Sequence, residues 1–251
     1  MRTIIWFIRA VFYLVAALPC KIKATRLRDS GDYAAFRKYA DDKVQDWTRK
    51  MLSNAGVTVE VHGLENLTGK PAIFVANHQS DFDIMLLLGY LDAPHGIVAK
   101  DSLSKVPMIG FWMSSIDCIF IDRNNPRKAL KTMNEAGKIV VDGRSIIIFP
   151  EGTRSCKDEI GEFKAGAFKT AFKYNLPVVP LAIDGTYKVM EGNKGKRIRP
   201  AHVILTVLPE IETDDIDKDA QKNFGDEIKK IIEDGREETR RKISKSKGGI
   251  S

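Results

Sequence analysis

A histidine and an aspartate in this sequence stand at a spacing that could form a base. His78 follows the apolar stretch 72–76, and Asp83 lies five residues further on, at the start of an apolar helical stretch. On one ideal helix two such side chains would diverge by about 140°, but across a strand-to-helix corner they can meet. A carboxylate there holds one imidazole nitrogen protonated and leaves the other able to take a proton. The pair therefore indicates a general base, with a hydrogen bond at a loop corner as the plain alternative.

Two arginines follow other apolar runs. Arg123 comes after residues 118–121, and Arg154 lies in the segment Phe-Pro-Glu-Gly-Thr-Arg-Ser at 149–155. Gly152 in that segment allows close backbone approach, and a guanidinium presents a planar fork of donors to a phosphate. A single loop arginine usually makes a surface ion pair. Because α/β proteins place ligands at one end of their strands, two arginines near a candidate base indicate an anion site.

Short β-branched runs alternate with helical stretches from residue 57 onward, which predicts an α/β layered fold. The continuously apolar runs are typical of strands that are covered on both faces. The predicted strands are 57–61, 72–76, 97–99, 118–121, 145–149, 178–183 and 202–208, and the predicted helices lie near 83–91, 127–141, 163–174 and 215–243.

The N-terminal region combines apolar and basic residues. Residues 4–18 form an apolar run that is interrupted by Arg9. As a helix this run would reach roughly 22 Å, short of the ~30 Å hydrocarbon core of a bilayer. We predict a retained anchor that lies in the membrane interface, with aromatic residues such as Trp6 and Phe12 at head-group depth. A cleaved signal peptide and an ordinary buried helix are the alternatives.

A second helical segment follows a basic patch at residues 21–28. Its apolar residues recur every three or four positions and so form one face. These residues are Tyr33, Phe36, Ala40, Val44, Trp47 and Met51. We expect this face to contact the domain core, with docking on lipid as the alternative.

Composition narrows the class of protein. A net charge of +7, with 43% hydrophobic and 29% charged residues, is ordinary for a globular chain and excludes collagen, coiled-coil, disordered and polytopic membrane proteins. Residues 1–50 carry 11 basic and 5 acidic side chains, which predicts attraction to an anionic surface. Nucleic acid is the less favoured partner, because these basic residues flank an apolar anchor. Three scattered cysteines suit neither a disulfide framework nor a zinc site.

These patterns predict a domain organisation. An N-terminal helical membrane anchor with an amphipathic helix would occupy residues 1–55, an α/β domain residues 56–245, and a frayed tail residues 246–251. The α/β domain would hold a mostly parallel central sheet of about seven strands flanked by helices, preceded by the membrane-docking segment.

Four segments stand in the order and spacing of the four motifs of the glycerolipid acyltransferase family. They are Asn77-His78 with Asp83, Phe-Ile-Asp-Arg at 120–123, residues 149–155 and residues 178–183. Over roughly residues 57–210 the sequence resembles this family, and within it the bacterial 1-acyl-sn-glycerol-3-phosphate acyltransferases. Lys100, with Leu103 after it, resembles the segment that such enzymes carry between the first two motifs.

The resemblance implies transfer of a fatty acyl group to the sn-2 hydroxyl of 1-acyl-sn-glycerol-3-phosphate (lysophosphatidic acid), which gives phosphatidic acid. It implies that His78 is the general base and that Asp83 orients and stabilises its imidazolium. Five further residues would bind or shape the site of the acceptor's phosphate: Lys100, Arg123, Glu151, Gly152 and Arg154. The fourth motif would line an acyl tunnel or support the sheet.

The implied partners are acyl-CoA or acyl carrier protein as donor, lysophosphatidic acid, and a lipid surface on the cytoplasmic face of the cell membrane, with peripheral or monotopic attachment. No metal or cofactor is expected, because a thioester is already activated. Three alternatives stay open. They are a different acceptor such as glycerol-3-phosphate or another lysophospholipid, a thioester hydrolase with the same His–Asp pair, and a non-enzymatic lipid-binding protein.

Overall fold

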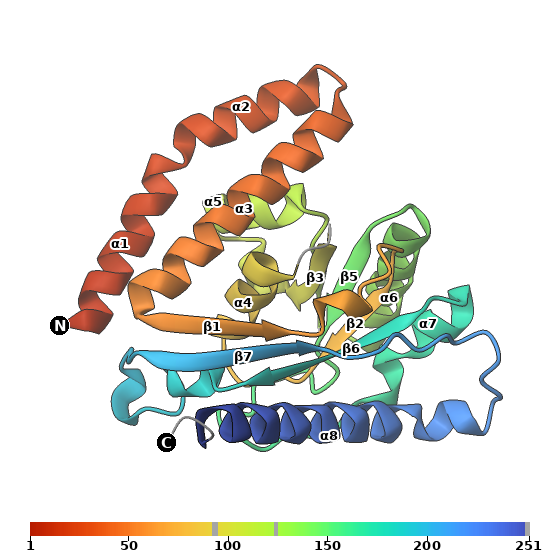
Figure 1. Cartoon of the computed structure of the whole chain (residues 1–251). Helices are drawn as coiled ribbons and strands as arrows, with labels where there is room; N and C mark the ends of the chain where they lie inside the picture. Colours follow the sequence, from red (N-terminus) through yellow and green to blue (C-terminus); the bar gives the residue numbers. More distant parts are fainter. Residues whose placement is uncertain (92–94, 123–124, 249–251) are drawn as a thin grey trace.

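A seven-stranded sheet forms the centre of the molecule, in a computed structural model that describes residues 1–91, 95–122 and 125–248 (Figure 1). The strands follow the order β1-β7-β6-β2-β5-β3-β4, and each neighbouring pair is parallel except β6 with β7. This arrangement confirms the predicted α/β fold with a mostly parallel sheet. The strands are β1 (Val57–His62), β2 (Ile73–Ala76), β3 (His95–Lys100), β4 (Ile119–Ile121), β5 (Ser145–Ile148), β6 (Val178–Asp184) and β7 (Ala201–Val207).

Helices cover both faces of the sheet. Their bounds are α1 (Arg2–Ala16), α2 (Leu18–Asp29), α3 (Tyr33–Ala55), α4 (Phe82–Tyr90), α5 (Pro107–Ser115), α6 (Pro126–Val141), α7 (Lys169–Tyr174) and α8 (Ala220–Gly248). The sequence did not predict α5. Helix α8 continues into the segment predicted to be a frayed tail, of which residues 249–251 lie outside the described residues.

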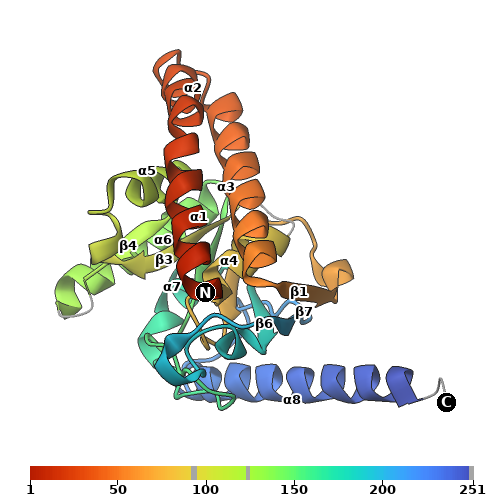
Figure 2. The ribbon, with the colours of Figure 1, turned by 90° about the vertical axis from the view of Figure 1, so that its left-hand side faces the viewer.

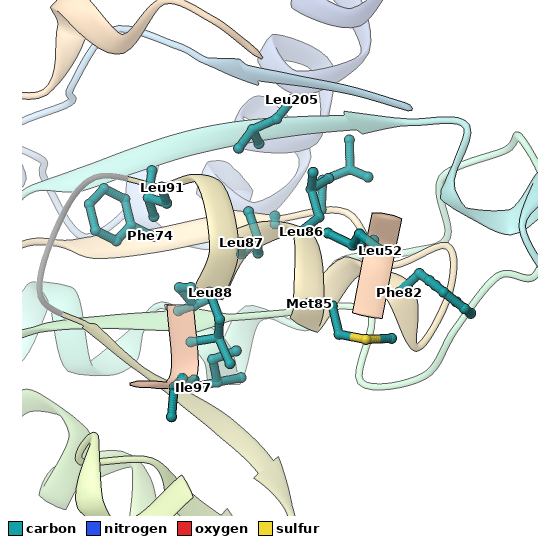
Figure 3. Close-up of a cluster of buried hydrophobic side chains, with 14 of the residues drawn as sticks. Leu52, Phe74, Phe82, Met85, Leu86, Leu87, Leu88, Leu91, Ile97 and Leu205 are labelled. Atoms are coloured by element: carbon teal, nitrogen blue, oxygen red, sulfur yellow. The ribbon is translucent and has the colours of Figure 1, made fainter. Parts of the chain in front are cut away.

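Alternate side chains of a strand pack into two separate hydrophobic cores, because the sheet is covered by helices on both faces. In β2, Phe74 and Ala76 join the core beneath α3, α4 and α5, whereas Ile73 and Val75 join the core beneath α6, α7 and α8. Figure 3 shows the first core, in which leucines of α4 gather with side chains from α3, β2, β3 and β7. The apolar α4 is thus buried between the sheet and α3.

The register of the parallel strands brings their carboxyl ends to one edge of the sheet. Val75 of β2 pairs with Ile148 of β5 on one side and with Pro180 of β6 on the other. The loops that follow these three strands are therefore neighbours in space. Strand β6, the fourth motif, is buried along its whole length between β2 and β7 and supports the sheet.

The N-terminal region contains two helices where the sequence predicted one interfacial helix. Helix α1 ends at Ala16, and α2 follows at a bend of 40° and includes the basic patch. Pro19 fits there because the first turn of a helix needs no donor from its backbone nitrogen. Among the described residues, no single helix has the length and apolar character to cross a bilayer, and only the bent α1–α2 pair reaches that threshold when taken together.

Helix α1 has a buried face and an exposed face. Trp6 is buried, and its Nε1 donates to the carbonyl oxygen of Met51 at 2.9 Å. Its ring also lies 5.5 Å from that of Phe82. The prediction that Trp6 sits among lipid head groups is therefore wrong, because the indole anchors α1 to α3 and α4. Nine other apolar side chains of α1 and α2 are 46–66% exposed: Ile4, Ile5, Phe7, Ile8, Val11, Phe12, Val15, Leu18 and Ile22.

The predicted apolar face of α3 contacts the core. Ala40, Val44 and Met51 are buried, while Tyr33 at the helix start is exposed. Gly56 then ends the helix with φ of 81°, a left-handed conformation that glycine adopts without steric cost. The face predicted from periodicity is therefore confirmed, apart from its first residue.

Candidate active site

His78 and Asp83 meet at the corner between β2 and α4. His78 Nδ1 lies 2.8 Å from Asp83 Oδ2, and both residues are buried. Because a carboxylate only accepts, this contact places the ring proton on Nδ1 and leaves the lone pair on Nε2. The His78 ring also stacks on Phe149, with ring centroids 4.1 Å apart. The corner thus holds one imidazole in a single orientation.

The Asp83 carboxylate is held by its own turn and by a distant loop. Its Oδ2 also accepts the backbone N–H groups of Gln79 at 2.6 Å and Ser80 at 2.8 Å. Its Oδ1 accepts the hydroxyl of Thr186, from the loop after β6. Asp83 lies in the first turn of α4, where a negative charge is favoured by the helix dipole. Four donors therefore fix the carboxylate that orients His78.

Glu151 supports the same corner from the loop after β5. Its Oε1 accepts the backbone N–H of His78 at 2.6 Å, and its Oε2 accepts that of Gly161 at 2.8 Å. Burial raises the pKa of the Glu151 carboxyl above its usual value, and the two amide hydrogen bonds oppose that rise. Glu151 thus accepts two backbone amides, and the bond to His78 ties the first and third motifs together.

Asn77 joins the end of β2 to β6. Its side-chain amide donates to the carbonyl oxygen of Ile183 at 3.0 Å and accepts the N–H of the same residue at 2.8 Å. The side chain is fully buried. This two-way hydrogen bond fixes the strand end from which His78 projects.

Arg154 lies between two carboxylates at the N-terminus of α4. Its Nη1 contacts the carboxylate of Asp81 and lies 3.4 Å from Glu191 Oε1. Glu191, whose side chain is 2% exposed, also accepts the hydroxyl of Ser80 at 2.5 Å and the N–H of Asp81 at 2.8 Å. The Asp81 side chain is 55% exposed. Arg154 is thus held by one buried acid and one exposed acid, close to His78.

The other predicted cations differ in how the structure places them. Lys100 is exposed at the carboxyl end of β3, on the same edge of the sheet. Arg123 lies outside the described residues. Gly152 has φ of 69°, and a Cβ there would lie 2.9 Å from the Nζ of Lys164. Lys164, which the sequence did not single out, therefore brings a further ammonium beside the Arg154 loop.

Helix α8 holds the loop that follows β5, which carries Glu151, Arg154 and Asp158, against the sheet. The Arg240 guanidinium bonds Asp184 at the end of β6, at 2.5 and 2.6 Å, and Asp158 in the loop, at 2.5 and 3.2 Å. Arg236 donates to the backbone oxygen of Asp158 at 2.5 Å. Hydrogen bonds from Arg240 lower the pKa of the Asp158 carboxyl. The segment that carries Glu151 and Arg154 is thereby fixed at its middle.

Replacing Arg240 by alanine is expected to lower the free energy of unfolding by about 1–3 kcal/mol at neutral pH, because the buried Asp184 loses its guanidinium partner. Because the pKa of Asp158 is lowered in the folded protein, its ion pair with Arg240 stabilises the fold above the pKa that Asp158 has in the unfolded chain. This stabilisation is lost as the pH falls through the pKa of Asp158 in the folded protein. Urea denaturation should therefore show a difference that shrinks in acid. Arg241→Ala, which removes an exposed pair with Glu237, is the matched control; an equal loss in both variants would contradict this role of Arg240.

An apolar cavity of about 440 Å³ opens beside the site. Its walls come from α1, α3, α4 and α5, with Trp6, Trp47, Met85 and Trp112 among the lining residues. Asp81, the partner of Arg154, also lines it. Asp81 therefore joins the carboxylates around Arg154 to the cavity at the start of α4, whereas His78 and Arg154 themselves are not among its lining residues.

Sequence reasoning missed the partners that the loop after β6 supplies. Thr186 and Glu191 follow the fourth motif by a few residues, yet they contact Asp83, Ser80 and Arg154. The order of the elements could have indicated them, because the loop that follows a central parallel strand lies at the edge of the sheet where ligands bind.

Comparison with known proteins agrees with these observations. A family model described as Acyltransferase matches residues 58–184. A probable 1-acyl-sn-glycerol-3-phosphate acyltransferase of Mycoplasma pneumoniae is 36% identical over 152 residues, 59% of this chain and 56% of that protein. The 1-acyl-sn-glycerol-3-phosphate acyltransferase of Pseudomonas aeruginosa is 33% identical over 177 residues, 68% of each chain.

The fold has a solved counterpart. The crystal structure of the 1-acyl-sn-glycerophosphate acyltransferase PlsC of Thermotoga maritima superposes with a TM-score of 0.81 at 26% identity, over 95% of both chains. This chain spans less than two thirds of the length of several curated relatives, the M. pneumoniae protein among them. The family match, the motif residues gathered at one corner and the shared fold together show that the chain belongs to the acyltransferase family.

Proposed function

We propose that this protein transfers a fatty acyl group from acyl-CoA or acyl carrier protein to the sn-2 hydroxyl of 1-acyl-sn-glycerol-3-phosphate, forming phosphatidic acid. The observation that carries the proposal is the hydrogen bond of 2.8 Å between His78 Nδ1 and Asp83 Oδ2, set beside Arg154 and an apolar cavity. The names of the relatives support this choice of acceptor.

In the proposed mechanism His78 is the general base. Its Nε2 takes the proton of the acceptor hydroxyl while the hydroxyl oxygen attacks the thioester carbonyl, and Asp83 stabilises the imidazolium that forms. The tetrahedral intermediate then collapses to an ester, and the imidazolium returns the proton to the leaving thiolate. A positioned base contributes about 10²–10⁴ in rate. Orientation of the two substrates supplies a further part of the acceleration.

The acceptor's phosphate is proposed to bind Arg154, with Lys164 and Lys100 as neighbouring cations. Arg123, which lies outside the described residues, stays a predicted phosphate ligand on the basis of the sequence alone. A phosphomonoester carries up to two negative charges and can take the place of the exposed Asp81 carboxylate on Arg154. Glu191 would keep the guanidinium in position during that exchange, because it is buried and also bound to the α4 N-terminus.

Replacing Arg154 by alanine is expected to raise the KM for the acceptor about tenfold or more, since a charge-assisted contact to phosphate is lost. The effect on kcat should be smaller, because His78 does not contact Arg154. Initial rates measured over a range of lysophosphatidic acid concentrations would check this result. Arg241→Ala again serves as the control, and an unchanged acceptor KM in Arg154→Ala would remove that residue from the phosphate site.

The acyl chain is proposed to occupy the apolar cavity beside α4. Its walls are predominantly apolar, and one of them is formed by α1. Deleting the N-terminal segment would therefore open this cavity as well as remove the exposed apolar face, so surface substitutions are the cleaner way to examine membrane attachment.

Membrane attachment is proposed through the exposed face of α1 and α2 together with the basic patch of α2. An exposed apolar stripe flanked by cations is typical of a helix that lies in the interface of a membrane. The acceptor and the product both reside in the bilayer, whereas the acyl donor is soluble. Peripheral or monotopic attachment on the cytoplasmic face would bring the site to both substrates.

The function is tested with purified protein, lysophosphatidic acid in mixed micelles, and each acyl donor in turn. The proposal requires phosphatidic acid to form in step with acceptor consumption. Free fatty acid without acceptor consumption would instead identify a thioester hydrolase. Faster turnover of glycerol-3-phosphate or of another lysophospholipid would replace the proposed acceptor.

A further inference from the structure

A short basic loop between β6 and β7 carries four unpaired cations. Residues 194–199, here called the basic loop, contain Lys194, Lys196, Arg197 and Arg199, all exposed. Within the part of the chain that the structure describes, these four side chains make no hydrogen bond or ion pair. Like charges held this close repel one another, and an anionic surface supplies the missing counter-charge. We propose that the basic loop binds anionic phospholipid head groups at the membrane surface on which α1 docks.

The basic loop has a defined conformation. The side-chain amide of Asn193 donates to the backbone oxygens of Lys188 at 2.7 Å and Arg197 at 3.0 Å. The backbone N–H of Arg199 donates to Val189 at 2.9 Å. Gly195 turns the chain with φ of 68°. The cations are therefore presented by an ordered turn, which lowers the entropy lost when they bind a surface.

The basic loop is fixed to the start of α1. The backbone N–H of Ile198 donates to the hydroxyl of Thr3 at 2.9 Å, and the Ile198 side chain is buried. Trp6, one turn further along, is bonded to α3. In Figure 2 the chain between β6 and β7 passes beneath the N-terminus of α1, which lies in front of the molecule. Loop and helix therefore form one surface.

The exposed apolar stripe of α1 and α2 lies between two groups of cations. Its members follow one another at intervals of three or four residues: Ile4, Ile8, Val11, Val15, Leu18 and Ile22. The basic patch at residues 21–28 lies at one end of this stripe, and the basic loop lies at the other, next to Thr3. Cations at both ends favour a helix that lies parallel to the membrane surface, because insertion of either end would bury charge.

This inference rests on the proposed membrane-resident acceptor, and it gives the active site an orientation. Glu191 belongs to the same segment as the basic loop and contacts Ser80 and Asp81 beside His78. Contact of the loop with head groups would therefore bring the N-terminus of α4 toward the lipid surface. The phosphate of an acceptor lies at that same depth in a bilayer.

The test is a quadruple variant, Lys194→Gln, Lys196→Asn, Arg197→Gln and Arg199→Gln. Asparagine is used at 196 because it tolerates the left-handed φ of 48° at that position. Binding is measured by co-sedimentation with vesicles of phosphatidylcholine alone or with about one third phosphatidylglycerol. Each cation near an anionic membrane is worth about a fivefold change in partitioning. We expect at least a twentyfold loss on the anionic vesicles at low salt, a much smaller loss at about 1 M salt, and no change on neutral vesicles.

The matched control removes four lysines just before α8 or in its first half, on the face of the sheet opposite α1: Lys218→Gln, Lys222→Gln, Lys229→Gln and Lys230→Gln. It lowers the net charge equally and should partition like the wild type. Binding of the basic-loop variant equal to that of the control would overturn the inference, as would an equal loss on neutral vesicles.

Failure of the proposed function gives a different result, since vesicle binding needs no turnover. In nonionic micelles the basic-loop variant should turn over lysophosphatidic acid at the wild-type rate. Loss of micellar turnover with vesicle binding intact would overturn the lipid role of the loop and place it in the acceptor site. Wild-type protein that binds anionic vesicles through the loop yet forms no phosphatidic acid would refute the proposed activity alone.

Discussion

Replacing His78 by alanine is expected to lower kcat for acyl transfer by about 10²-fold or more, because no other imidazole can take the hydroxyl proton at that corner. The acceptor KM should change little, since the substitution leaves Arg154, the proposed phosphate ligand, in place. The measurement is the initial rate of phosphatidic acid formation at saturating concentrations of both substrates. Thermal melting would establish that the folded protein is being compared.

His202→Ala provides the matched control. His202 is an exposed residue that pairs with Glu60 at 2.9 Å, on the β1–β7 side of the sheet. Its removal should leave the rate within about twofold of wild type, as is usual for a surface substitution. Near-normal turnover of His78→Ala, or an equal loss in the two variants, would refute the general-base assignment.

Replacing Asp83 by asparagine is expected to lower kcat by about 10²–10⁴, although the two side chains have the same shape. An amide can present its NH₂ group to Nδ1, which moves the ring proton to Nε2 and removes the lone pair that the hydroxyl needs. An amide also cannot stabilise the imidazolium as a carboxylate does. The check is kcat for Asp83→Asn together with its melting temperature.

Asp81→Asn separates Asp83 from its neighbour, because it makes the same change two positions earlier. Asp81 contacts Arg154, and the structure gives it no hydrogen bond to the imidazole. Its substitution should act mainly on the acceptor KM. A larger loss of kcat in Asp81→Asn than in Asp83→Asn would show that the wrong carboxylate had been assigned to His78.

The fold could be predicted from the sequence where burial leaves a clear pattern. The runs 145–149 and 178–183 are continuously apolar because β5 and β6 are covered on both faces, and both were found within a residue or two. The contact between His78 and Asp83 could also be anticipated, since a strand-to-helix corner brings such residues together. Local pattern and tertiary structure agree at these positions.

Other features depend on contacts that no local pattern encodes. Glu191 and Thr186 reach the site only because β6 lies beside β2 in the sheet. The same limit applies to Arg240, whose partners are Asp158 and Asp184. A charged residue in an unpatterned loop carries no sign of the partner that it will meet.

Trp6 shows how hydropathy can mislead. It lies in an apolar run in which neighbouring residues, such as Phe7 and Phe12, are exposed. Hydropathy treats all of these side chains alike, because a core and a lipid surface are both apolar environments. Only the hydrogen bond to Met51 and the contact with Phe82 reveal which face of α1 belongs to the protein.

The place of β1 in the sheet has a consequence for biosynthesis. Among the described strands, β1 pairs with β7 alone, so Val57 finds its partner only when Ala201 has been made. Closing so long a segment is slow, and it leaves a strand edge unpaired meanwhile. A nascent chain on the ribosome would thus display α1 and a bare β1 before the last strand emerges. Under the proposed membrane attachment, early binding of α1 to the bilayer would hold this intermediate apart from other nascent chains while the sheet is completed.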